Sequence, residues 1–158
     1  MGHLNNRRRL LQTGGILAMG ALAPWRVQAA ESHLIYLSPV KRDGSLSRCQ
    51  AEVWYVQSDA DMYVVTASSA WRAEAPRQGL TRTQVWVGDV GVWSRSRGKY
   101  KELPSLMTEA QLVDDPAVHA RLLERFGVKY ASEWGTWGPR FKNGLADGSR
   151  VMLRYSPV

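Results

Sequence analysis

The sequence predicts a mainly β domain in which about six antiparallel strands form a closed or nearly closed barrel. Two observations favour this fold. Short segments that alternate apolar and polar residues recur along the chain, each bounded by a turn rich in Gly, Asp or Ser. Helical signals are confined to a short segment near the middle of the chain and a longer one before the last strand.

The first half of the domain contains three strand segments. Residues 33–37 alternate, and the turn at 41–45 contains Asp-Gly, which favours a tight hairpin. Residues 48–57 and 62–67 are rich in β-forming side chains and are separated by a polar turn. We expect the last two segments to pair as a hairpin.

A short helix and a fourth strand come next. The helix falls within residues 68–80, where Ser68 or Ser69 can cap its start. The following strand, 81–87, alternates as Thr-Arg-Thr-Gln-Val-Trp-Val. Residues 92–96 are a candidate for a further strand.

The second half is predicted to be extended, then helical, then irregular. Residues 100–113 are extended in character, although Pro104 interrupts them. Asp115 followed by Pro116 predicts a helix start, and the apolar spacing continues to Phe126 before Gly127 ends it. An irregular segment at 133–148 and a final alternating strand at 149–155 complete the domain. The chain thus divides into a leader at 1–30 and a single domain at 31–158.

Residues 1–30 have the three parts of an export signal. Paired arginines in Asn6-Arg7-Arg8-Arg9-Leu10-Leu11-Gln12 precede a short apolar run, and small residues end at Ala29 and Ala30. The leader resembles signals read by the twin-arginine (Tat) machinery, with a Sec signal or an uncleaved anchor as alternatives. The Tat reading implies a periplasmic or otherwise exported protein that folds before transport. We expect cleavage after Ala29 or Ala30, which leaves no stable membrane span.

Composition excludes several function classes. The formal charge is +7, and removing the four arginines of the leader, which contains no acid, leaves +3, with no dense basic face for nucleic acid. Cys49 is the only cysteine, so no intramolecular disulfide forms. The histidines lack metal-ligand spacing, and no catalytic triad or carboxylate pair is present. The sequence therefore predicts neither a metal site nor catalytic side chains.

The order of elements resembles the split β-barrel of the pyridoxamine 5′-phosphate oxidase-like, FMN-binding flavoproteins and their deazaflavin-binding relatives. The likeness is carried by residues 51–56, 62–72 and 81–89. It implies a homodimer, because the sites of that family lie at a dimer interface. It also implies an exported flavin-binding protein, with FMN or a deazaflavin as cofactor and, if the protein is an enzyme, an oxidoreductase activity.

The resemblance also assigns cofactor-binding residues. The flavin phosphate would lie near Thr66, Ser68, Ser69 and Arg72, because hydroxyls and a guanidinium bind phosphate well. Trp54 and Tyr55 would flank the ring, and Trp71 could stack on it.

The same residues leave other interpretations open. Many relatives have two adjacent basic residues where this chain has Trp71-Arg72, and a carboxylate at Glu52 would oppose a phosphate if it faced the site. Residues 68–72 could equally be a helix cap with a surface arginine. The alternative function is a cofactor-free split-barrel binding module of the cell envelope that binds a small ligand of the envelope, such as a small planar ligand, or a partner through its tryptophan-rich mouth. A purely structural envelope protein is the third reading.

Overall fold

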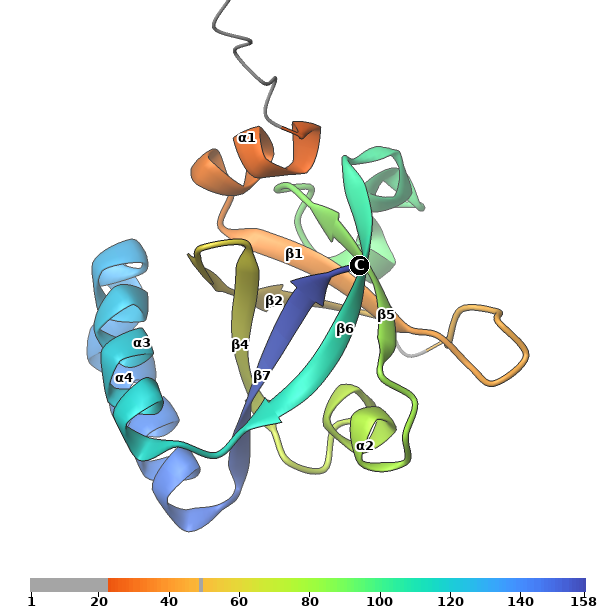
Figure 1. Cartoon of the computed structure of the whole chain (residues 1–158). Helices are drawn as coiled ribbons and strands as arrows, with labels where there is room; N and C mark the ends of the chain where they lie inside the picture. Colours follow the sequence, from red (N-terminus) through yellow and green to blue (C-terminus); the bar gives the residue numbers. More distant parts are fainter. Residues whose placement is uncertain (1–22, 49) are drawn as a thin grey trace, which may run out of the picture.

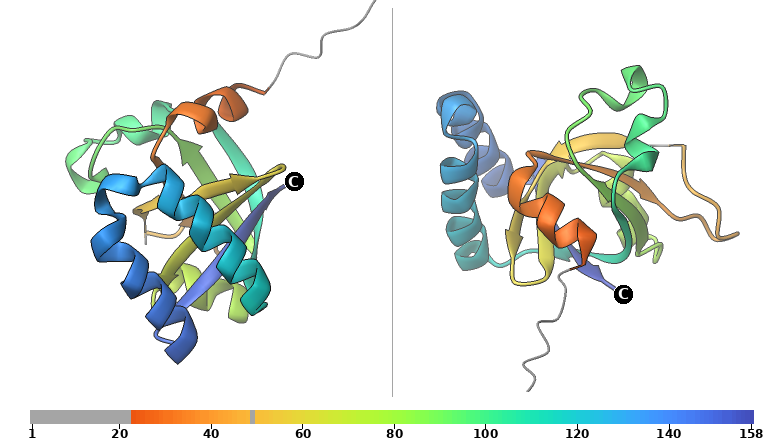
Figure 2. Two further views of the ribbon diagram at one scale, coloured as in Figure 1. Left: turned by 90° about the vertical axis from the view of Figure 1, so that its left-hand side faces the viewer. Right: turned by 90° about the horizontal axis from the view of Figure 1, so that it is seen from above.

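The computed structural model describes residues 23–48 and 50–158. The paired arginines and the apolar run of the leader lie in residues 1–22, outside the described part of the chain. Within the described ranges, seven antiparallel strands form one sheet of order β2-β1-β5-β6-β7-β4-β3 that curls into a nearly closed barrel (Figures 1 and 2). The strands are β1 (Leu34–Pro39), β2 (Ala51–Trp54), β3 (Val56–Ser58), β4 (Asp61–Ala67), β5 (Arg82–Val87), β6 (Ser105–Val113) and β7 (Arg150–Pro157). The predicted fold class is confirmed.

Alternation along the strands divides the side chains between two sides of the sheet. In β4, Met62 and Val64 belong to the cluster inside the barrel, whereas Tyr63 and Val65 pack against the outer helices. The interior cluster also includes Ile35 and residues of every strand except β3. The barrel is therefore a filled core rather than a channel.

The segment predicted as one strand at 48–57 is divided at Tyr55. The part after the bend, β3, pairs with β4 as the predicted hairpin, with Val56 opposite Tyr63. The part before it, β2, pairs with β1, with Trp54 opposite Leu34. A change of direction lets one continuous β-forming segment contribute to both edges of the sheet.

Two short helices cover opposite ends of the barrel (Figure 1). Helix α1 (Pro24–Glu31) lies across one end and buries Trp25 and Ala29 in the interior cluster. Helix α2 (Trp71–Arg77) lies across the other end through Ala73 and Ala75, both fully buried. The predicted serine cap of α2 is wrong, because the helix begins after Ala70 with no side-chain hydrogen bond at its start.

Two longer helices pack outside β3, β4 and β7 (Figure 2, left). Helix α3 (Pro116–Lys129) begins where predicted, with the Asp115 carboxylate accepting from the amide of Ala117 at 2.8 Å. It continues two residues past Gly127. Helix α4 (Ala131–Asp147) replaces the predicted irregular segment at 133–148, because aromatic residues three, four and seven positions apart pack its inner face against α3 and the sheet.

A loop with two turns of 3₁₀ helix covers the remaining face of the sheet. Its two turns are η1 (Trp93–Arg95) and η2 (Lys99–Glu102), so the strand predicted at 92–96 is wrong and the extended segment begins at Ser105. Tyr100 packs there on Tyr36 and Trp86. None of the helices in the described ranges has the length and apolar character that crossing a membrane requires.

Candidate functional site

Three of the predicted phosphate ligands lie where β4 ends and the turn to α2 begins: Thr66 in the strand, and Ser68 and Ser69 in the turn. Thr66 ends the inward-facing row of β4, is 2% exposed, and its hydroxyl makes no hydrogen bond to any described residue. Ser69 is exposed, whereas Ser68 is partly buried. The Ser68 amide donates to Ser149 O at 2.9 Å, and its carbonyl accepts from Arg77 at 2.7 Å. The backbone of the turn is therefore fixed, the Ser69 hydroxyl is exposed, and the Thr66 hydroxyl is buried without a hydrogen-bond partner among the described residues.

Trp71 and Arg72 occupy the first turn of α2, directly after these hydroxyls. Both side chains are partly buried. Burial raises the pKa of Tyr155, a fully buried residue of β7, and the positive charge of Arg72 opposes that rise. The charge of the Arg72 guanidinium thus lowers the pKa of a tyrosine inside the barrel. Thr66 lies at the same end of the barrel, where α2 covers it.

Trp54 lies apart from this turn. Its indole stacks on the Tyr130 ring with centroids 4.3 Å apart and planes inclined by 6°, and it meets Trp137 edge-on at 5.9 Å. It belongs to the aromatic cluster between the sheet and the two outer helices. In this arrangement Trp54 packs between the sheet and the outer helices α3 and α4.

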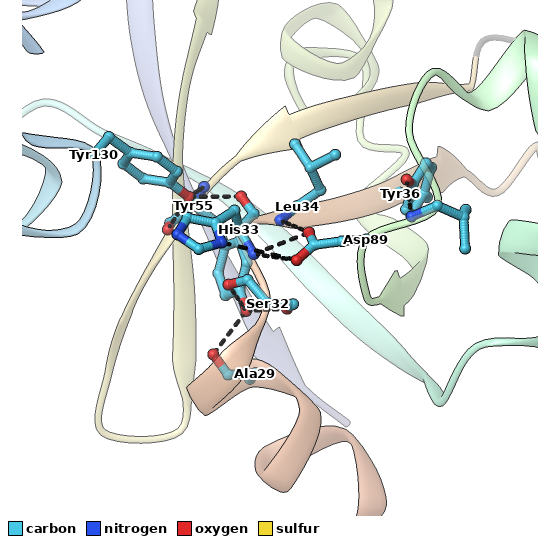
Figure 3. Close-up of polar contacts among 9 residues, drawn as sticks. Ala29, Ser32, His33, Leu34, Tyr36, Tyr55, Asp89 and Tyr130 are labelled. Atoms are coloured by element: carbon cyan, nitrogen blue, oxygen red, sulfur yellow. Dashed lines mark hydrogen bonds and ion pairs between the residues drawn. The ribbon is translucent and has the colours of Figure 1, made fainter. Parts of the chain in front are cut away.

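Tyr55 lies beside Ala29 of α1 (Figure 3), and α1 and α2 lie at opposite ends of the barrel (Figure 1). The ring is fully buried, and its hydroxyl donates to Ala29 O at 2.9 Å and lies 2.9 Å from Ser32 Oγ. Burial raises the pKa of Tyr55 to about 12, so the phenol is neutral near pH 7. The chain thus places the two predicted ring-flanking residues in two different environments.

Tyr130 joins the outer helices to the barrel beside Tyr55. Its oxygen accepts from the amide of Tyr55 at 2.9 Å and lies 2.7 Å from His33 O and 2.8 Å from Tyr55 O, so its single proton serves one carbonyl at a time (Figure 3). Burial raises the pKa of Tyr130 as well. These contacts fix the bend that divides β2 from β3.

Asp89 fixes the start of β1. Its carboxylate accepts from the amides of His33 and Leu34 at 2.8–3.0 Å, and the His33 imidazole lies 3.8 Å from it. The ammonium of Lys129, at the end of α3, lies over the Tyr55 ring at 3.5 Å, and burial lowers the pKa of this lysine to about 8. Asp89 opposes that shift through its negative charge.

The seven predicted residues therefore fall into separate places. Five lie at the β4–α2 turn, Trp54 lies under the outer helices, and Tyr55 lies at the α1 end. A groove of 970 Å³ runs between α3 and α4, and none of the seven lines it. Asp89, Lys129 and Tyr130 carry no local motif by which the sequence could predict them, and only folding brings Asp89 to the adjacent pair Lys129 and Tyr130.

The comparisons with known proteins identify the fold. No protein-family model and no curated protein sequence matches the chain. Among solved structures, the chain is similar to HutZ, a heme storage protein of Vibrio cholerae, with a TM-score of 0.56 and 13% identity over 84% of this chain and 87% of that one. It is similar to a putative pyridoxamine 5′-phosphate oxidase from Listeria innocua (TM-score 0.53, 14% identity, 84% and 89% covered). A FAD-binding protein from Mesorhizobium loti gives a TM-score of 0.55 and 15% identity over 85% and 87%. The chain therefore has the split β-barrel fold of the pyridoxamine 5′-phosphate oxidase-like proteins.

Proposed function

We propose that this protein binds a flavin. The observation that carries the proposal is the shared split barrel, because the solved structures with this fold include a FAD-binding protein and a putative pyridoxamine 5′-phosphate oxidase. FMN is the cofactor we favour, with a deazaflavin as the alternative. Export through the Tat pathway and a homodimer belong to the same proposal and rest on the leader and on the family resemblance.

The β4–α2 turn fits the phosphate end of such a cofactor. The Thr66 hydroxyl has no hydrogen-bond partner among the described residues, and a buried hydroxyl of this kind is stabilised by a ligand or an ordered water. The exposed Ser69 hydroxyl and the Arg72 guanidinium follow within one turn of chain. A guanidinium can bind phosphate through two parallel hydrogen bonds, so one arginine supplies both charge and orientation.

Glu52 does not stand against this assignment. Its carboxylate accepts from the amide of Trp93 at 3.1 Å, in the loop over the outer face of the sheet. The carboxylate of Glu52 therefore already has a hydrogen-bond donor, the amide of Trp93 in η1. Two differences from the family pattern remain: the first flavin-contacting strand lacks a basic residue, and Trp71 offers an aromatic face where many relatives have a second cation.

The protein's part in any reaction would be to bind and orient the cofactor. A bound flavin supplies the hydride chemistry. Thr66, Ser69 and Arg72 would hold its phosphate, and Trp71 would cover one face of the group bound beside it. No side chain of this chain is assigned a catalytic role.

Titration with FMN tests the proposal. Residues 31–158 and the full chain, purified from cytoplasmic expression, should show a flavin absorption band or saturable FMN binding. Arg72→Ala should weaken binding about tenfold or more, because a charge-assisted hydrogen bond contributes about 1.5–3 kcal/mol. Arg82→Ala removes the same charge from an exposed position on β5 and is the matched control.

The titration also separates the rival functions. Unchanged FMN affinity in Arg72→Ala would remove Arg72 from the site. A wild-type chain that binds neither FMN nor a deazaflavin would refute the flavin proposal and favour the cofactor-free binding module. Trp71→Ala should change the fluorescence of bound flavin, and no change would assign Trp71 to packing.

A further inference from the structure

Helix α1 packs on the barrel through two buried side chains, Trp25 and Ala29. It has eight residues, and no side chain caps its start. A helix of this length is marginal on its own, so docking keeps it helical. Among its described side chains, two are buried and four are exposed: Trp25 and Ala29 are buried, whereas Pro24, Arg26, Val27 and Ala30 are exposed.

The indole of Trp25 occupies the mouth of the barrel. It is 9% exposed and belongs to the interior cluster together with Tyr55, Val85 and Val87. The guanidinium of Arg26 lies 5.1 Å from the centroid of the indole. A flat ring therefore closes this end of the barrel, and it comes from the one segment there that the sequence predicts to be removed.

The polar groups around this mouth belong mainly to the retained part of the chain. The Tyr55 hydroxyl donates to Ala29 O and contacts Ser32 Oγ. Asp89 holds the amides of His33 and Leu34 without help from α1. Cleavage after Ala29 or Ala30 would thus remove the indole and one acceptor of Tyr55, while the start of β1 would keep its anchor.

We propose that α1 is a removable plug. The Trp25 indole fills a ring-binding site at this end of the barrel, and processing opens the site to a planar aromatic ligand with a polar atom that hydrogen-bonds to Tyr55. The proposal rests on the predicted cleavage at Ala29 or Ala30. It does not depend on flavin binding, because the β4–α2 turn lies at the opposite end of the barrel (Figure 1).

The plug is tested in the full chain with indole as the probe and no flavin present. Trp25→Ala should stay folded and be stabilised by indole, with Tm rising by about 4 °C at ten times the Kd. Wild type should show no rise, because its own indole fills the site. Val27→Ala is the matched control, since Val27 is on the same helix and 52% exposed.

Two results of the indole experiment would overturn the proposal. A folded Trp25→Ala chain that indole does not stabilise has no ring site. A Trp25→Ala chain that does not fold shows that the domain needs this side chain and cannot lose it by processing. The mass of the exported protein gives an independent check: a start at residue 30 or 31 supports the plug, whereas a start before Trp25 overturns it.

Discussion

Replacing Gly138 with alanine should destabilise the domain, although alanine is the better helix former. Gly138 is buried in α4, and a Cβ there would lie 2.9 Å from both Cε2 and Nε1 of Trp134. Moving the indole away from a Cβ would disturb its contacts with two aromatic rings, because it stacks on Phe126 at 6.2 Å and meets Phe141 edge-on at 5.8 Å. Overpacking a core costs about 1–3 kcal/mol, which exceeds the gain of about 1 kcal/mol in helix propensity. The expected net loss is up to about 2 kcal/mol.

Gly135→Ala is the matched control on the same helix. A Cβ at this position meets nothing within 4 Å. The substitution should stabilise the domain by about 1 kcal/mol through helix propensity alone. Urea unfolding followed by circular dichroism measures both free energies of unfolding. If Gly138→Ala is as stable as Gly135→Ala, the fit of the Trp134 indole against the α4 backbone does not limit this position.

Three further substitutions test other contacts. Tyr130→Phe should lower the free energy of unfolding by about 1–3 kcal/mol, because it leaves the buried amide of Tyr55 without its acceptor. Tyr100→Phe is its control, since the Tyr100 hydroxyl makes no hydrogen bond within the described ranges, and an equal loss in both would contradict the assignment. Burial lowers the pKa of Lys129 from 10.5 to about 8, so the unfolded chain binds more protons between those values and stability should rise from pH 8 toward pH 10. Lys129→Met should remove that rise in a plot of Tm against pH, and a curve unchanged from wild type would assign the pH dependence to other groups. Asp115→Ala should cost about 1 kcal/mol in urea unfolding through loss of the α3 cap, and a cost near zero would show that Pro116 alone fixes the start of the helix.

The sequence predicts those parts of the fold that short-range signals determine. The start of α3 follows from Asp115 and Pro116, which act on the backbone next to them. The strands follow from alternation, because one side of each faces the filled interior. The bend at Tyr55 has no local signal, since β-forming residues continue through it and Tyr130, far along the chain, holds it in place.

Helix α4 was missed because its glycines and Pro139 are typical of irregular chain. In the folded protein two of those glycines have packing roles. Gly138 leaves room for Trp134, and a Cβ at Gly144 would lie 2.7 Å from the Arg150 side chain. Spacing of Trp134, Trp137 and Phe141 was the signal that could have identified the helix.

The residues of the candidate site also divide into those that are neighbours in the sequence and those that only folding brings together. Thr66, Ser68, Ser69, Trp71 and Arg72 are neighbours in the sequence, so a local motif can group them. Tyr55, Asp89 and the adjacent pair Lys129 and Tyr130 come from three separate parts of the chain, and only tertiary packing brings them together. Their grouping at the α1 end of the barrel could not be predicted from spacing.

The position of β7 in the sheet determines when this domain can fold during synthesis. Among the described strands β7 comes last in the sequence, yet it lies between β4 and β6, with Leu153 opposite both Val64 and Leu112. Until β7 leaves the ribosome, β3 and β4 cannot pair with the rest of the sheet through it, and the interior cannot close. A ribosome-bound nascent chain lacking β7 would therefore expose its barrel residues to chaperones, and the barrel would close only once β7 has left the ribosome.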